Sequence, residues 1–136
     1  MARKSKAVIL DSWSIIAYLE DELAGEKMEE IIADAHENGI PLMTTVVNAG
    51  EVWHIVSQEA SEAEADQSIR ELKQLGVEIV DADWKLAHAA AVFKSKHSMS
   101  FADCFAAALA KENKADLVTG DKEFKQVEGE VKIAWV

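Results

Sequence analysis

Short apolar runs alternate with helix-like segments along this sequence, and this alternation constrains the fold more than any other feature. The apolar runs cover residues 6–11, 41–45, 77–80, 115–121 and 131–136, and each has the length of a buried strand. Since helical segments separate them, consecutive strands must be joined by crossover connections. We therefore predict a three-layer α/β/α fold, in which helices cover both faces of a central parallel sheet of about five strands.

Capping and stop signals place the helices between these strands. One helix begins at Ser12 or Ser14, and a second covers residues 25–38 and ends at an Asn-Gly pair. Others are expected over residues 46–57, 61–75 and 83–96. A last helix begins at Ser100, where Ser100 and Asp103 have the spacing of a capping box.

The length of the chain suits one globular domain over residues 1–136, because 136 residues with 49% hydrophobic composition can bury a real core. Its single cysteine, Cys104, has no partner for an internal disulfide, and we expect it in the core. No apolar run is long enough for a membrane span or a secretory signal. We therefore expect a cytoplasmic protein without a membrane partner.

Negative charge is concentrated in the first part of the chain. The formal net charge is −11, which disfavours contact with phosphate groups. Residues 1–84 contain 6 basic and 18 acidic residues, whereas residues 85–136 contain 8 basic and 7 acidic residues. The second part is therefore open to nucleic acid, with Lys94, Lys96, His97, Lys122 and Lys125 as the nearest basic residues to the acids described next.

Four carboxylates are expected to converge at the carboxyl edge of the sheet, where parallel α/β folds place their sites. Asp11 ends the first strand and Asp121 follows the fourth. Asp103 lies in the first turn of the helix whose far end leads into the fourth strand. Glu51 lies one or two turns into the helix that leaves the second strand. The four side chains can meet if strands one, two and four are neighbours.

Each acid also has a purely structural interpretation. Asp11 can cap the helix that follows it, Asp103 can complete the capping box, and Asp121 can be a turn residue. Glu51 is harder to explain in this way, because its helix is apolar on nearly all sides. An unpaired buried charge costs several kcal/mol, and a bound cation would remove that cost.

Four motifs occur in a specific order: VILDSWSIIAYL, TTVVNAGEV, SFADCFAAALA and ADLVTGDKEF. Together they resemble the PIN-domain family and, at this length, the VapC-type toxins of toxin–antitoxin pairs. The resemblance covers residues 7–136. It implies an endoribonuclease that depends on Mg²⁺ or Mn²⁺, with an acidic quartet of Asp11, Glu51, Asp103 and Asp121. Thr119 and Ser12 would be auxiliary polar contacts, and Asn48 also fits the family pattern.

The residues themselves agree with this chemistry. Hydrolysis of a phosphodiester needs a nucleophilic water and neutralisation of phosphoryl charge, and divalent cations held by carboxylates supply both. We assign Asp11, Asp103 and Asp121 to one or two Mg²⁺ ions and Glu51 to the metal or its water. Thr119 is assigned to the scissile phosphate or a metal-bound water. The four histidines show no paired spacing, and no phosphate-binding GxxxxGK[ST] loop occurs.

The expected partners follow from this assignment and from the resemblance. The substrate would be RNA. A VapB-like antitoxin would insert a basic side chain against the carboxylates and lay an amphipathic segment over Trp13, Ile16, Leu19 and Leu23. The resemblance also implies a homodimer.

Three alternatives remain at this point. A haloacid-dehalogenase-like phosphatase also has an Asp after its first strand, but it needs a second Asp at the position of Trp13. A response-regulator receiver needs a phosphorylatable Asp after the middle strand, and the residues around Asp81 and Asp83 do not clearly match. The third is a PIN fold that binds RNA or protein with weak or no nuclease activity.

Overall fold

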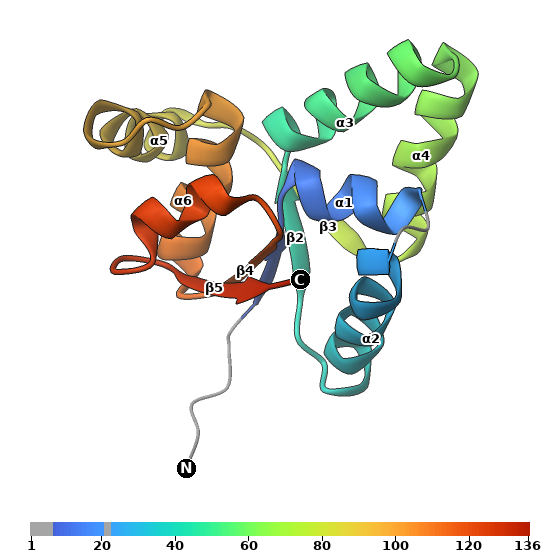
Figure 1. Ribbon diagram of the computed structural model, residues 1–136, viewed down its shortest axis with the longest axis horizontal. Helices are drawn as coiled ribbons and strands as arrows, with labels where there is room; N and C mark the ends of the chain where they lie inside the picture. Colours follow the sequence, from blue (N-terminus) through green and yellow to red (C-terminus); the bar gives the residue numbers. More distant parts are fainter. Residues whose placement is uncertain (1–6, 21–22) are drawn as a thin grey trace.

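The computed structural model describes residues 7–20 and 23–136 of the chain. Strands and helices alternate as the apolar pattern predicts (Figure 1). The predicted start of the first strand, Lys6, lies outside the described residues. In chain order the elements are β1 (Val8–Leu10), α1 (Ser12–Leu19), α2 (Leu23–Glu37), β2 (Leu42–Thr45), α3 (Val46–Glu59), α4 (Glu62–Gln74), β3 (Val77–Val80), α5 (Trp84–Lys96), α6 (Phe101–Asn113), β4 (Asp116–Thr119), the 3-10 helix η1 (Lys122–Val127) and β5 (Lys132–Trp135).

The five strands form one parallel sheet in the order β3-β2-β1-β4-β5. The central strand is β1, whose Val8 is in register with Leu42 on one side and with Asp116 on the other. After β1 the chain builds β2 and β3 outward on one side and then crosses back to build β4 and β5 on the other. The strand order therefore reverses between β1 and β4. The predicted neighbourhood of strands one, two and four is confirmed.

Helices cover both faces of this sheet, so the predicted three-layer α/β/α arrangement is confirmed (Figure 1). The side chains of successive residues in β1 point to opposite faces of the sheet. Val8 and Leu10 pack with apolar residues of α1, α2, α3 and α4, whereas Ile9 packs with residues of α5, α6 and η1. Cys104 is fully buried in the second of these cores, as expected.

Several boundaries differ from the sequence prediction: helix α2 begins at Leu23 instead of residue 25, and α3 ends at Glu59 instead of residue 57. The six-residue helix η1, which directly follows Asp121, was not predicted. Phe124 and Val127 are the buried residues of η1, and they are three positions apart. This spacing matches the three residues per turn of a 3-10 helix and anchors η1 to the core. Within residues 7–20 and 23–136, no helix is both long and apolar enough to cross a membrane.

Candidate metal centre

Asp11 lies at the carboxyl end of β1 and is the N-cap of α1. Its Oδ1 accepts a hydrogen bond from the backbone N–H of Ser14 at 2.8 Å. Its Oδ2 accepts one from the hydroxyl of Thr119 at 2.6 Å. The capping interpretation is therefore correct, and the same carboxylate also contacts β4. Only 1% of Asp11 is exposed, so it is held rigidly at the point where the strand order reverses.

Thr119 joins two of the predicted acids. Besides donating to Asp11, its Oγ1 accepts a hydrogen bond from the backbone N–H of Asp121 at 3.0 Å. Asp121 is in turn the N-cap of η1. The structure thus shows Thr119 as a fully buried link between Asp11 and Asp121. Its contact with a phosphate or a metal-bound water stays a prediction.

Asp103 lies in the first turn of α6, as predicted, and its backbone N–H donates to the Ser100 hydroxyl at 3.1 Å. The helix start is therefore the expected capping motif. Burial, together with the charges of Asp121, Asp11 and Glu51, raises the pKa of Asp103 from 3.8 to about 7. A hydrogen bond from Ser100 opposes this rise. Glu51, Asp103 and Asp121 line one cleft, and Thr119 links Asp121 to Asp11, so the structure brings the four carboxylates into one region.

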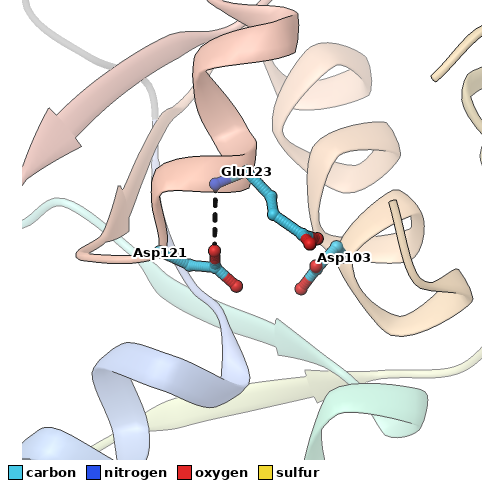
Figure 2. A group of neighbouring side chains, drawn as sticks. All are labelled: Asp103, Asp121 and Glu123. Carbon is cyan, nitrogen blue, oxygen red and sulfur yellow. Dashed lines mark hydrogen bonds between the residues drawn. The ribbon is translucent and has the colours of Figure 1, made fainter. Parts of the chain in front are cut away.

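The tightest group of carboxylates consists of Asp103, Asp121 and Glu123, each with an oxygen within 4.8 Å of the others (Figure 2). Figure 2 shows the Glu123 side chain reaching across to Asp103, while its backbone N–H donates to Asp121 Oδ1 at 3.0 Å. The sequence analysis did not include Glu123. The signal for it was its place two residues after Asp121, on the first turn of the unpredicted helix η1.

Glu51 faces the same site from α3. It is half-buried and lines a cleft of about 380 Å³. Asp103 and Asp121 line the same cleft, which also has an apolar wall formed by Trp13, Ile16, Ala17 and Ile55 of α1 and α3. Asp11 and Glu51 therefore flank the tight group instead of belonging to it.

Asn48 fixes the three helices that carry these acids. Its side chain is fully buried, and its Nδ2 donates to Ser12 Oγ of α1 and to the Ala102 carbonyl of α6, both at 3.1 Å. Its Oδ1 accepts a hydrogen bond from the Thr45 hydroxyl at 2.6 Å. A buried amide is stable only when its donors and acceptor are satisfied, and here they are. Asn48 thereby holds the helix starts next to Asp11 and Asp103 in fixed positions.

Within the part of the chain that the structure describes, these carboxylates form no ion pair with a cationic side chain. The ion pairs found in the described part of the chain involve other residues. Burial is the main reason that the pKa of Asp11 is raised to about 6. The hydrogen bonds from Thr119 and Ser14 lower it, and the charge of Asp121 raises it. Positive helix N-termini partly compensate, because Asp11, Asp103 and Asp121 all lie at helix starts.

Comparison with known proteins agrees with this arrangement. Residues 8–130 match the model of the PIN domain family. No curated protein sequence matches the chain significantly.

Several solved structures share the fold. One is VapBC2 of Rickettsia felis, bound to a DNA fragment from the VapBC2 promoter. It is 13% identical, with a TM-score of 0.76, and the match covers 95% of this chain and 98% of that chain. The sarcin-ricin loop cleaving toxin VapC20 of Mycobacterium tuberculosis is 15% identical, with a TM-score of 0.73 and coverage of 93% and 98%. DNA-bound VapBC of Salmonella typhimurium is 15% identical, with a TM-score of 0.76 and coverage of 95% and 97%. With a family match over nearly its whole length, the chain belongs to the PIN domain family.

Proposed function

We propose that this protein is a divalent-metal-dependent endoribonuclease that acts as the toxin of a VapBC-type pair. The observation that carries the proposal is the group of Asp103, Asp121 and Glu123, with Asp11 and Glu51 beside it and no ion pair to any of the five among residues 7–20 and 23–136. Membership of the PIN family sets aside the phosphatase and receiver alternatives. A PIN fold that only binds its partners remains the competing function.

The donor set fits Mg²⁺ or Mn²⁺. These hard cations prefer carboxylate oxygens, and three oxygens within 4.8 Å of one another can share one ion. A bound ion would neutralise phosphoryl charge and lower the pKa of a coordinated water. Asp103, Asp121 and Glu123 are proposed to hold it. Asp11 would contribute through the carboxylate that Thr119 and Ser14 orient.

Glu51 has a different place in the proposed mechanism. Because it lines the open cleft, its carboxylate can accept a proton from the attacking water or bind the metal from the solvent side. Asn48, one helical turn before it, holds α3 against α1 and α6. The geometry therefore keeps a potential proton acceptor beside the metal-binding group.

Substrate approach is expected from the side of η1. Lys122 and Lys125 are exposed on this helix, directly after Asp121. Lys94 and His97 already have partners within the protein. Lys94 Nζ donates to the Met99 carbonyl, and His97 lies 3.4 Å from a Glu130 oxygen. Positive charge on η1 would attract phosphate next to the carboxylates.

The proposed partners follow from the exposed apolar residues. Trp13 and Leu23 are exposed on α1 and α2 by 37% and 97%. Solved structures that share the fold include toxin–antitoxin complexes. We therefore propose that a VapB-like antitoxin covers α1 and α2, that the toxin forms a homodimer, and that both act in the cytoplasm, where their RNA is found.

Cleavage of total cellular RNA tests the activity. Wild type in Mg²⁺ should produce discrete fragments, and EDTA should prevent them. Asp103→Asn and Asp121→Asn should each reduce the rate by at least about 100-fold, which corresponds to about 3 kcal/mol of lost transition-state stabilisation.

Asp83→Asn is the matched control, because Asp83 also caps a helix through its side chain but lies outside the cleft. This variant should cleave like wild type. Undiminished cleavage by both site variants, or cleavage in EDTA, would contradict the proposal. RNA binding without any cleavage in Mg²⁺ or Mn²⁺ would favour the binding-module alternative.

A further inference from the structure

The apolar wall of the cleft includes one aromatic residue, and the metal chemistry does not explain it. Trp13 is the second residue of α1 and lines the cleft together with Asp103 and Asp121. Overall 37% of this large residue is exposed. Its indole gives the cleft a flat apolar surface beside the carboxylates, where a ligand can lie when no antitoxin covers α1.

The Trp13 ring is also held in a fixed position by Gly120, which directly follows β4. Gly120 lies between Thr119 and Asp121, and a Cβ at this position would come within 3.0 Å of three carbons of the Trp13 six-membered ring. The ring therefore rests directly on the Gly120 backbone. Any side chain larger than hydrogen at residue 120 would collide with the ring, so the contact depends on glycine at this position. Trp13 is thus a rigid surface next to Asp121.

A ligand for this cleft must combine two properties. Its anionic part must lie at the metal-binding carboxylates, and a flat apolar part must lie against Trp13. A nucleotide has both, with the phosphate and the base a few bonds apart. The volume of about 380 Å³ is at the small end of the range of ligand pockets, which suits one nucleotide unit.

We propose that Trp13 is a stacking platform for the nucleobase next to the scissile phosphate. This inference rests on the proposed nuclease function and adds to it a residue that contacts the base, which must then be unpaired. A base inside a duplex is stacked on both sides and cannot lie on Trp13, whereas a base in a loop or single strand can. Stacking on Trp13 would depend little on which base is bound, because every base has a π-face.

Calorimetric binding of two small probes in Mg²⁺ tests the platform without cleavage. Adenosine 5′-monophosphate has a phosphate and a base, and ribose 5-phosphate has the phosphate alone. Wild type should bind the nucleotide about tenfold or more tightly than the sugar phosphate, which is within the range of one base–aromatic stack. Trp13→Leu should lose this advantage and still bind ribose 5-phosphate like wild type. Trp13→Phe should keep most of it.

Trp84→Leu is the matched control, since Trp84 is 76% exposed on α5 and does not line the cleft. It should bind both probes like wild type. Fluorescence gives a second readout. The emission of Trp13 is the difference between the emission of wild type and that of Trp13→Phe, and binding of the nucleotide should quench it. Oligoribonucleotides should show the same preference, with single strands cleaved faster than the matching duplex.

The outcomes separate this inference from the nuclease proposal. Equal binding of both probes by wild type would overturn the platform while leaving the metal site intact. If Trp13→Leu lost affinity for both probes equally, Trp13 would only support the fold. If the nucleotide did not quench Trp13 emission, Trp13 would contact protein and not the base. Absence of Mg²⁺-dependent binding of ribose 5-phosphate, together with absence of RNA cleavage, would overturn the nuclease proposal and this inference with it.

Discussion

Replacement of Asp11 by Asn should stabilise the metal-free protein, and the gain should depend on pH. Burial raises the pKa of Asp11 from 3.8 to about 6. A carboxyl group with a raised folded-state pKa favours folding at low pH, below the unfolded pKa, and this favourable contribution is lost as the pH rises through the folded pKa. Wild type should therefore lose stability between about pH 4 and pH 6, because Asp11 must ionise in a buried place.

The size of the effect follows from the pKa shift. One pKa unit corresponds to about 1.4 kcal/mol, so ionised Asp11 lowers the free energy of unfolding by about 3 kcal/mol at pH 8 and by about half as much at pH 5. The Asn side chain still caps α1 by accepting from the Ser14 N–H. Its amide nitrogen takes the place of Oδ2 and cannot accept the hydrogen bond from the Thr119 hydroxyl, which costs about 1 kcal/mol. The variant should be about 2 kcal/mol more stable at pH 8 and within about 1 kcal/mol of wild type at pH 5.

Thermal unfolding in EDTA at pH 8 and pH 5 measures this difference. At pH 8 the Tm of Asp11→Asn should exceed that of wild type by about 5 °C or more. Asp83→Asn, which alters an exposed capping carboxylate, should match wild type within about 0.5 kcal/mol at both pH values. Millimolar Mg²⁺ should then stabilise wild type more than Asp11→Asn. A variant that melts at or below the wild-type Tm in EDTA at pH 8 would refute the reasoning.

Two further changes test the structure around the site. Asn48→Leu should lower the free energy of unfolding by about 2–4 kcal/mol, because the buried Thr45 hydroxyl loses its acceptor and α3 loses its side-chain hydrogen bond to α6. Chemical denaturation of this variant beside Asn113→Leu, whose amide donates to the Leu109 carbonyl, measures the excess. Gly120→Ala should cost about 1–3 kcal/mol through collision with the Trp13 ring. In a Trp13→Ala background it should cost less than about 0.5 kcal/mol, and an unchanged cost in that double variant would exclude the collision.

The sequence was sufficient to predict where the acids lie along the sheet. Strands show as short apolar runs, and parallel strands end at one edge, so the places of Asp11 and Asp121 follow from the residues that precede them. Asp103 could be placed because its capping box marks the start of α6. The capping role of Asp11 uses only one of its two oxygens, because Oδ1 caps α1 while Oδ2 accepts from Thr119 on β4. Its role in a metal site stays a prediction.

The closeness of individual carboxylates could not be predicted in the same way. Whether Glu123 or Glu51 joins the tight group depends on side-chain directions and on the 3-10 helix η1, which brings Glu123 back toward Asp103. A spacing of three between Phe124 and Val127 was the available signal for that helix. The network around Asn48 connects residues up to 54 positions apart, and such contacts depend on how α1, α3 and α6 pack.

The pairing of β1 with β4 determines when during synthesis the site can exist. The hydrogen bond between Asp11 and Thr119 spans 108 residues, and Asp103, Asp121 and Glu123 are all translated after the whole β2–α5 region. A nascent chain that has folded as far as β3 holds Asp11 and Glu51 but not the tight carboxylate group. The group of Asp103, Asp121 and Glu123 therefore cannot assemble beside Asp11 until residues 103–123 have left the ribosome and β4 has inserted beside β1.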